Sequence, residues 1–552
     1  MPIATNDQPA VQHVPSASQQ LATSNTYVVA RTRYGEIRGG RLSNGVQAFL
    51  SESEGLAPAL TCEQMSRTAK MSLVGPTRRR CPVVTVTLRI RTHGAEVTAR
   101  RITIMLRTVV SLQLSALVPP DPCLGRLGAA TVNPFFLDIY VPSTCNLAGP
   151  MVTVPVNVYI HGGALQQGNT FENGHDQQWE SSERYQELRV NVAYRLSVLG
   201  FLACDQPDIS GNFGFKDCWL ALEWIRDNIK NFGGDPNQVH LSGLSAGAHI
   251  VHQLLHRTAR LCPQPALFIT ATLHSNALIT TPPLRSSKRH QVEALCAQIG
   301  VDTKTSNVLD ALRQVPLGDL FAAVSGMGSL STFRGVCDVD GFVAHDLMEY
   351  QKSGQLALGL RKAGVKCVIV GDVKDEIAFY RTQHPVEKLS EVRPNLLRYY
   401  PAFTCDALLA AFPPLGEAAT SDELNDYQGL ILASAQSHLP IRRLYRDLTD
   451  WGVPVLRYTV ELPLRSSKRY PSVDHGSDLP IHHLMPGLLN AAEKEAASCF
   501  VDELRRAVQE ALDGSDSWKT RQWLVLEANG ESIWANDRKA EACREALTIL
   551  WC

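Results

Sequence analysis

The stretch Asn231–His256, NFGGDPNQVHLSGLSAGAHIVHQLLH, decides the fold. Val239–Leu241 predicts a short buried strand, and from Ala246 onward apolar residues recur with helical spacing. Between them, Gly243–Gly247 fits the pattern G-x-S-x-G with Ser245 at its centre. The segment therefore predicts a strand, a sharp turn at a serine and a helix, in that order.

A serine at such a turn is pushed out of the path of the chain and presents its hydroxyl at a helix N-terminus. The flanking glycines permit the turn because a Cβ atom at either position would clash. Backbone N–H groups and the helix dipole favour negative charge that develops beside the hydroxyl. These features are typical of a nucleophilic serine, and a glycine-rich structural turn is the alternative interpretation.

The run FGGDPNQVHLSGLSAGA resembles the FGGDP…GESAGA signature of the type-B carboxylesterases and cholinesterase-like lipases. The resemblance covers Thr26–Leu50 weakly and Phe136–Cys552 through several local motifs. It implies an α/β-hydrolase fold and a serine hydrolase that cleaves carboxylic esters of small molecules without a cofactor. Leu244 stands where the family usually has a supporting buried Glu, so the surroundings of the nucleophile depart from the family pattern.

Strands and helices alternate along most of the chain, which predicts an α/β fold with a mostly parallel sheet and helices on both faces. Residues 26–552 are expected to form one domain. Thr26–Arg41 predicts a hairpin that turns at Tyr34-Gly35, and the region from Thr281 to Phe342 predicts a helical cap over the site. The other strands expected are 137–142, 154–163, 190–202, 271–273, 366–370 and 453–458, and the helices expected are 219–229, 490–512 and 538–550.

A serine nucleophile needs a base, and the base needs an acid that orients it. In α/β-hydrolases the acid follows the serine and the histidine comes last. Gly371–Glu376, GDVKDE, follows an apolar strand, at the strand end where open α/β sheets place their sites. It resembles the family motif K-D-E-G, whose Glu is the acid, so Glu376 is the expected acid although Ile377 replaces the glycine. Asp375 is the second choice, and a surface-loop carboxylate is the alternative.

The base is expected on a loop after a later strand. Asp474–Pro480, DHGSDLP, resembles the family motif H-G-x-D-L-P, which implies His475 as the base. A lone histidine is more often a surface residue, but chain order and context favour His475. His482 and His483 lack a following glycine and are left out.

Acyl transfer also needs hydrogen-bond donors for the oxyanion. Tyr159–Ala164, YIHGGA, follows an apolar strand and matches H-G-G-[AG]. Glycines let bare backbone N–H groups approach a carbonyl oxygen, so Gly162 and Gly163 are expected in the oxyanion hole. The N–H group of Ala246, next after the nucleophile, completes it. A glycine-rich hairpin turn is the weaker interpretation, because the preceding strand has the character of a buried parallel strand.

Two further patterns were weighed for binding. His249, His252 and His256 share one helix face with a spacing that suits a metal, but no carboxylate joins them and H-E-x-x-H is absent, so no metal site is expected. The heptapeptide PLRSSKR occurs at Pro283–Arg289 and again at Pro463–Arg469. Its flanks are unrelated, which predicts two exposed basic loops rather than a structural repeat. A docking or phosphorylation site is the minority interpretation of these loops.

The composition and net charge of the chain bear on whether it binds nucleic acid or membranes. The chain has 552 residues, a formal net charge of −1, and 44% hydrophobic and 19% charged residues. Such a charge gives no indication of nucleic-acid binding or of attraction to an anionic membrane. Since no window approaches ~18 consecutive apolar residues, no membrane span is expected.

Several features favour a cytoplasmic location. Residues 1–25 are polar and rich in Pro, Ser and Gln, which predicts a disordered lead-in rather than a signal peptide. The 14 cysteines form no C-x-x-C pair, and no N-x-S/T sequon occurs. Secreted members of the family carry a cysteine where this chain has Pro134. A reducing compartment follows from these features together, with secretion as the second choice.

Residues 51–134 depart from the family pattern, which stops after Leu50 and resumes near Phe136. The segment has no Phe, Tyr or Trp and is rich in Arg, including Arg78–Arg80. Aromatic residues dominate cores and buried arginines need partners, so we expect it to form no packed part of the hydrolase core. One interpretation is a true insertion with a basic binding surface. The other, which we favour, is intron or frame-shifted sequence in the gene model.

Two other functions compete with ester hydrolysis. One is a non-catalytic adhesion or scaffold protein of the same fold, although such relatives usually lose the serine or the histidine and this chain keeps both. The other is a catalytically impaired product, because residues 51–134 replace core strands and part of the wall of the active-site gorge.

Overall fold

The computed structural model describes residues 27–32, 35–41, 47–48, 85–90, 136–142, 144–145, 152–170, 175–305, 307–416, 418–467, 470, 472–485, 487–519, 522–543 and 546. The lead-in predicted for residues 1–25 lies outside this set. So does most of the atypical segment 51–134.

Thirteen strands are described in order along these residues. They are β1 (Tyr27–Thr32), β2 (Gly35–Arg41), β3 (Gln47–Ala48), β4 (Thr85–Ile90), β5 (Phe136–Val141), β6 (Val154–Ile160), β7 (Leu188–Val192), β8 (Gly234–Leu244), β9 (Thr270–His274), β10 (Cys367–Val373), β11 (Val455–Val460), β12 (Trp523–Leu526) and β13 (Ser532–Ala535).

The described helices begin with α3. They are α3 (His175–Tyr185), α4 (Ser197–Phe201), α5 (Phe213–Asn228), α6 (Ala246–Arg260), α7 (Arg289–Ile299), α8 (Val308–Gln314), α9 (Leu317–Gly326), α10 (Leu347–Lys352), α11 (Gln355–Ala363), α12 (Ile377–Tyr380), α13 (Leu389–Leu396), α14 (Ala402–Ala411), α15 (Ser421–Ala433), α16 (Leu439–Thr449), α17 (Leu479–His482) and α18 (Ala491–Leu512), with short turns η2 (Ile229–Phe232), η3 (Arg285–Lys288), η4 (Gly328–Ser331), η5 (Ser434–His438) and η6 (Ser517–Lys519).

Ten of the strands form one sheet, in the order β13-β12-β11-β10-β9-β8-β6-β7-β5-β4. The strands from β12 to β7 in this order run parallel. β5 is antiparallel to β7, and β13 is antiparallel to β12. The predicted mostly parallel α/β sheet is therefore confirmed.

The hydrophobic core lies on both faces of this sheet. In β10, Val368 and Val370 belong to one core cluster, whereas Cys367 and Ile369 belong to another, as the alternation of side chains in a strand requires. Helices α5, α6, α11 and α16 pack into the first cluster, and α17 and α18 pack into the second. Central strands covered on both faces explain the nearly continuous apolar runs in the sequence.

One strand prediction is wrong in its second half. The apolar run 190–202 was expected to be extended, but β7 ends at Val192 and Ser197–Phe201 forms α4. Short apolar runs do not distinguish a buried strand from a buried helical turn. Here Gly200 lies so close to the backbone that an added Cβ would approach the carbonyl oxygen of Arg195 to 2.1 Å. That close approach belongs to the helical turn and leaves no room for a side chain at residue 200.

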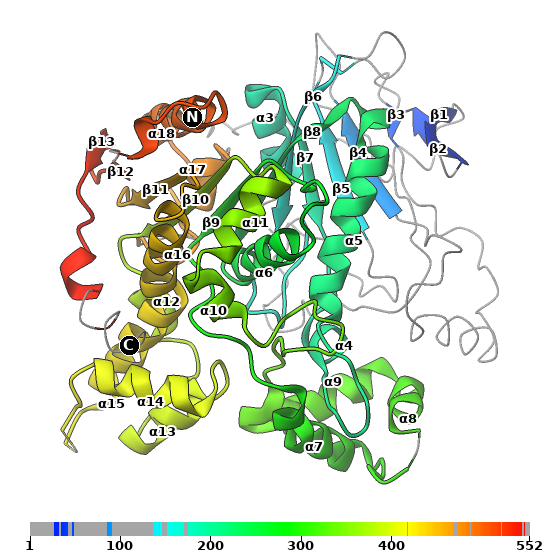
Figure 1. Cartoon of the computed structure of the whole chain (residues 1–552), viewed down its shortest axis with the longest axis vertical. Coiled ribbons are helices and arrows are strands. Elements are labelled where there is room, and N and C mark those ends of the chain that lie inside the picture. The colour runs from blue at the N-terminus through cyan, green and yellow to red at the C-terminus, as the bar shows by residue number, and fades with distance from the viewer. Residues whose placement is uncertain are drawn as a thin grey trace, which may run out of the picture.

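The N-terminal hairpin and the helical region are confirmed. β1 and β2 pair antiparallel with Thr32 opposite Gly35. The prediction of Gly35 as a turn residue is therefore wrong, because Gly35 is the first residue of β2. Helices α7 to α9, with η3 and η4, fall within 281–342. Figure 1 shows these three helices at the lower right and α13 to α15 at the lower left, below the sheet.

Within the atypical segment 51–134 the structure describes β4. This strand pairs parallel with β5 at the edge of the sheet. The expectation that the segment forms no packed part of the core stays a prediction for its other residues, which lie outside the described set. Among the described helices, none has the length and apolar character needed to cross a bilayer.

Candidate active site

Ser245 sits at the predicted turn, between the end of β8 and the start of α6. Its backbone has φ 56° and ψ −119°, a strained conformation that clusters at active sites. A Cβ at Gly243 would lie 2.5 Å from the carbonyl carbon of Gly247, and a Cβ at Gly247 would lie 2.0 Å from the carbonyl oxygen of Ile160. Both glycines are thus required by the close packing of the turn.

The loop that carries Gly162 and Gly163 lies against this serine. A Cβ at Gly162 would be 3.3 Å from the Cβ of Ser245, and Gly163 has φ +100°. Ala246 is the first residue of α6, where backbone N–H groups have no acceptor within the helix. The geometry therefore places Gly162 against the Ser245 side chain and Ala246 directly after it, at the start of α6.

His161 holds the glycine loop in place. Its Nδ1 donates to the carbonyl oxygen of Gly162 at 2.9 Å, and its ring stacks on Tyr194 at 4.5 Å between centroids. The Tyr194 hydroxyl donates in turn to the His161 carbonyl at 3.0 Å. Burial lowers the pKa of His161 to about 4, so the imidazole is neutral. It packs behind the glycine loop as an uncharged group.

Glu376 and His475 form a close pair. The Nδ1 atom of His475 lies 2.6 Å from Oε2 of Glu376, which is fully buried. The other carboxylate oxygen, Oε1, accepts a hydrogen bond of 3.1 Å from the Ser437 hydroxyl. The Nε2 atom of His475 is buried and has no hydrogen-bond partner among the described residues. The pair thus orients the imidazole and leaves one nitrogen free for a reacting group.

The surroundings of His475 tune its basicity. Its ring stacks on Phe379 at 4.6 Å and packs against Tyr380 at 5.2 Å between centroids. Burial lowers the pKa of His475, but the Glu376 carboxylate and its hydrogen bond outweigh burial, and the net pKa is raised above its usual 6.5.

Three carboxylates of the run 371–376 have three different surroundings. Asp372 is buried and accepts hydrogen bonds from Thr459, His438 and Arg442. Asp375 is exposed and accepts from the backbone N–H groups of residues 377 and 378, so it caps α12. Glu376 is the one of the three that contacts His475.

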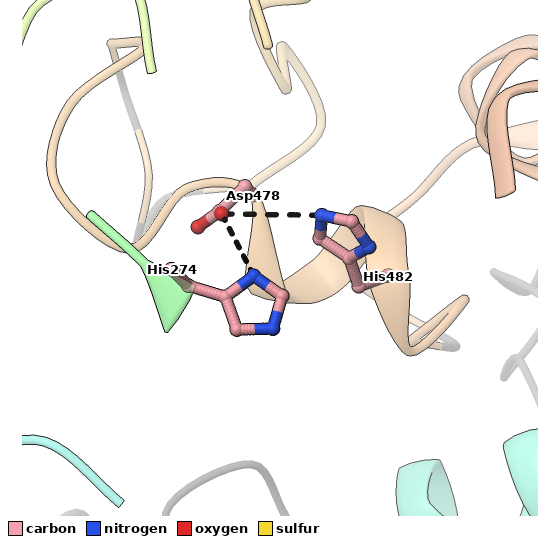
Figure 2. A group of neighbouring side chains, drawn as sticks. All are labelled: His274, Asp478 and His482. Carbon is pink, nitrogen blue, oxygen red and sulfur yellow. Dashed lines mark ion pairs between the residues drawn. The ribbon is translucent and has the colours of Figure 1, made fainter. Parts of the chain in front are cut away.

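A buried network follows His475 on the same loop. The Tyr458 hydroxyl donates to Oδ2 of Asp478 at 2.7 Å and lies 2.5 Å from Nδ1 of His274. Figure 2 shows the Asp478 carboxylate between the rings of His274 and His482, with N···O separations of 3.5 and 4.0 Å. Burial raises the pKa of Asp478, but its contacts with His274, His482 and Tyr458 outweigh burial and lower the pKa to about 2. The carboxylate is thus ionised and anchors the start of α17.

Backbone and apolar contacts connect this network to the nucleophile. The Ser245 N–H group donates to the His274 carbonyl at 2.9 Å. Leu244, the departure from the family pattern, forms an apolar cluster with Tyr159, Leu479 and Met485. Its side chain would also lie 3.3 Å from a Cβ at Gly476, next to His475. A leucine therefore packs the serine turn against the histidine loop.

The histidines of α6 have structural partners. His252 uses both ring nitrogens, one with Gln351 Oε1 at 2.9 Å and one with the Leu278 N–H group at 2.9 Å. Its ring stacks on His256 at 5.2 Å between centroids. Both nitrogens of His252 are thus occupied by protein groups, so His252 packs the helix and is not available as a metal ligand.

Sequence reasoning did not find the residues that support His475. Phe379, Tyr380 and Ser437 carry no motif of their own, and Tyr458 was read only as the end of a strand. His482 was set aside for lacking a glycine, although it faces Asp478. Asp478 lies within the histidine motif, and that motif is the signal in the sequence that points to its network.

The model of the carboxylesterase family matches residues 133–504. The chain belongs to the carboxylesterase family. An "Uncharacterized esterase/lipase" of Schizosaccharomyces pombe is 28% identical over 432 residues, which cover 73% of this chain and 78% of that protein. A "Carboxylic ester hydrolase" of Gibberella moniliformis is 29% identical over 449 residues, which cover 77% of this chain and 79% of that protein.

A solved structure titled "PNB esterase" matches the fold. Its TM-score is 0.63 at 18% identity, and the match covers 94% of this chain and 100% of that one. The α/β-hydrolase fold is thereby confirmed, and the family membership makes the protein an ester hydrolase. The family match begins at residue 133, so most of the atypical segment 51–134 lies outside it.

Proposed function

We propose that Ser245, His475 and Glu376 form the catalytic triad of a serine esterase that acts on small-molecule carboxylic esters. Ser245 Oγ attacks the ester carbonyl while His475 Nε2 takes its proton, and Glu376 stabilises the resulting imidazolium. The N–H groups of Gly162, Gly163 and Ala246 bind the oxyanion. His475 then protonates the departing alcohol. Water, activated by the same nitrogen, releases the acid and restores the serine.

One observation carries this proposal: the contact of 2.6 Å between Glu376 and His475, which leaves Nε2 unpartnered. A surface histidine would not be fixed by a buried carboxylate. The position of Gly162 against the Ser245 side chain supports the assignment of the oxyanion donors.

The test is hydrolysis of 4-nitrophenyl acetate by Ser245→Ala. We expect a loss of ~10⁴-fold or more in kcat, because removal of a nucleophile leaves only the contribution of binding and oxyanion stabilisation. The melting temperature should stay unchanged. Ser325→Ala, at an exposed serine of α9, is the matched control and should keep full activity. If Ser245→Ala keeps most of the activity, Ser245 is not the nucleophile.

A non-catalytic adhesion or scaffold role, or impaired catalysis, is the second candidate. The observation in its favour is Leu244, which replaces the buried Glu of the family. The same assay decides between them, since a wild-type rate no higher than that of Ser245→Ala would exclude catalysis at this site.

We also propose a reducing, cytoplasmic location. The described cysteines are free thiols, and most are buried. Titration of the denatured protein with a disulfide reagent, without added reductant, should find all 14 thiols of the sequence. A lower count would indicate disulfides and favour secretion.

A further inference from the structure

A cavity of about 470 Å³ lies beside the first turn of α6. His249 lines it, and the His249 N–H group donates to the Ser245 carbonyl at 3.0 Å. The rest of the wall comes from Gln436 and from residues within 277–290, 329–335 and 394–402, which are far apart in the sequence. The volume falls within the usual range for small-molecule pockets, ~300–1,000 Å³.

The Lys and Arg side chains that line this cavity are not balanced by any lining carboxylate. Lys288, Arg334 and Arg398 line it, and no Asp or Glu is among the lining residues. The Arg334 guanidinium lies 5.1 Å from the centroid of the Tyr399 ring. Arg398 donates to the neutral oxygens of Asn395 and Gly328. In the part of the chain that the structure describes, none of the three cations forms an ion pair with a carboxylate.

Lys288 differs from the other cations of its own loop. It belongs to the first PLRSSKR copy, in which Arg285 pairs with Asp208 at 2.5 Å and Arg289 pairs with Asp205. The predicted exposure holds for Arg289, although this residue begins α7 rather than lying in a loop. The prediction is wrong for Lys288, which is partly buried at the cavity. Burial, followed by the charge of Arg334, lowers the pKa of Lys288 to about 8. A partly buried cation without a carboxylate partner costs free energy unless an anion binds beside it.

The charge of Arg334 also reaches the groups between the cavity and the candidate triad. Burial dominates the pKa values of His249, Tyr380 and Tyr400, and the charge of Arg334 contributes to all three. Tyr380 packs directly on the His475 ring. Because His249 lines the cavity and lies in the helical turn that follows Ser245, an anion held there would lie near the candidate nucleophile.

We propose that this cavity binds the carboxylate of an anionic ester, such as a half-ester of a dicarboxylic acid or a carboxyl-bearing aryl ester. Lys288 and Arg334 are the principal cations, since Arg can hold a carboxylate through two hydrogen bonds and Lys through its charge. Leu278, Ile279 and Leu330 offer an apolar wall for the rest of the molecule. This inference rests on the proposed esterase function and names its substrate class.

The experiment compares matched neutral and anionic esters. One pair is 4-nitrophenyl pentanoate against mono-4-nitrophenyl glutarate, which places the charge on the acyl group. The other pair is phenyl butyrate against 4-carboxyphenyl butyrate, which places it on the alcohol. The wild-type enzyme should show a higher kcat/KM for the anionic member of at least one pair, and salt should reduce the preference. Equal or lower kcat/KM for the anionic member of both pairs would overturn the inference.

Variants then assign the preference to the cavity. In Lys288→Met and in Arg334→Met the ratio of anionic to neutral kcat/KM should fall about tenfold or more, since each removes a charged hydrogen bond. Lys352→Met, at an exposed lysine of α10, is the matched control and should keep the wild-type ratio. An unchanged ratio in both cavity variants would place the selectivity elsewhere and overturn the inference.

A binding measurement separates this inference from the proposed function. Calorimetry with 4-phenylbutyrate and its neutral amide requires no turnover. Tighter binding of the carboxylate, lost in Lys288→Met, supports the anion site even if no ester is hydrolysed. Turnover that depends on Ser245 without any preference for an anion would leave the esterase proposal standing and remove the inference.

Discussion

In the loops after β10 and β11 the buried carboxylate of Glu376 has partners within the protein, whereas the cations of the cavity wall have no carboxylate partner among the described residues. Glu376 is fully buried, yet His475 and Ser437 hydrogen-bond both of its oxygens. Lys288 and Arg334 are partly buried and lack a carboxylate partner among the described residues. The loops resemble a site preorganised for one reaction. The cavity wall resembles a binding site whose cations are neutralised only when an anionic ligand binds.

This difference separates two kinds of substitution. A change in the loops should lower the rate for every ester, because the reacting groups are common to all substrates. A change in the cavity wall should alter the choice among esters.

The two neighbouring carboxylates, Glu376 and Asp375, give the sharpest contrast. Glu376→Gln should lower kcat for a nitrophenyl ester by ~10³-fold or more, since it disrupts the orientation and charge stabilisation of His475. Asp375→Asn should stay within a few-fold, because Asp375 is exposed and caps α12. The reverse result would assign the role of the triad acid to Asp375.

The pH dependence tests the same pair. Only neutral His475 can accept the serine proton, so activity falls as pH drops through its pKa. Because Glu376 raises that pKa above 6.5, the acidic limb of kcat/KM in the wild type should lie above this value. In Glu376→Gln the main opposition to burial is lost and only the charges of Asp478 and Asp474 still raise the pKa of His475, so the limb should move to lower pH. An acidic limb at the same pH in both proteins would show that Glu376 does not face the titrating group.

The network of Asp478 should affect stability more than chemistry. Asp478→Asn removes the charge between His274 and His482 and should cost about 2–3 kcal/mol of stability, seen as a melting temperature lower by a few degrees. kcat should fall modestly, since the histidine loop is less well anchored. Asp502→Asn, in an ion pair with Arg184 at 52% exposure of both side chains, is the control and should change little. Equal melting temperatures for the two variants would contradict a buried anchor.

The atypical segment 51–134 should be the least protected part of the chain. Limited trypsin treatment should cut first within Arg78–Arg107 and leave a resistant fragment that begins near Asn133. The family match begins at residue 133, which agrees with this boundary. Protection of the arginine-rich stretch equal to that of the catalytic region would make the segment a genuine structural element, with β4 as its first described strand.

The sequence predicted those parts of the site that lie within a few residues of a strand end. Ser245 directly follows β8 and Glu376 lies shortly after β10, whereas His475 lies further along the loop after β11 and was predicted from its motif. The supporting contacts could not be predicted in this way. Tyr458 meets His274 across 184 residues of chain, and Lys288 meets Arg334 through a cavity built from separate loops. Such long-range contacts leave no periodic pattern in the local sequence. The error over residues 190–202 has the same origin, because tertiary packing turned an apolar run into α4.

Covalent labelling tests whether Ser245 is the nucleophile. Paraoxon should phosphorylate Ser245, and mass spectrometry should find diethyl phosphate on that serine within the tryptic peptide Asn231–Arg257. No label is expected in Ser245→Ala, and a much slower reaction is expected in His475→Ala, because the serine needs its base. Labelling at another residue, or at Ser245 with an unchanged rate in His475→Ala, would contradict the proposed triad.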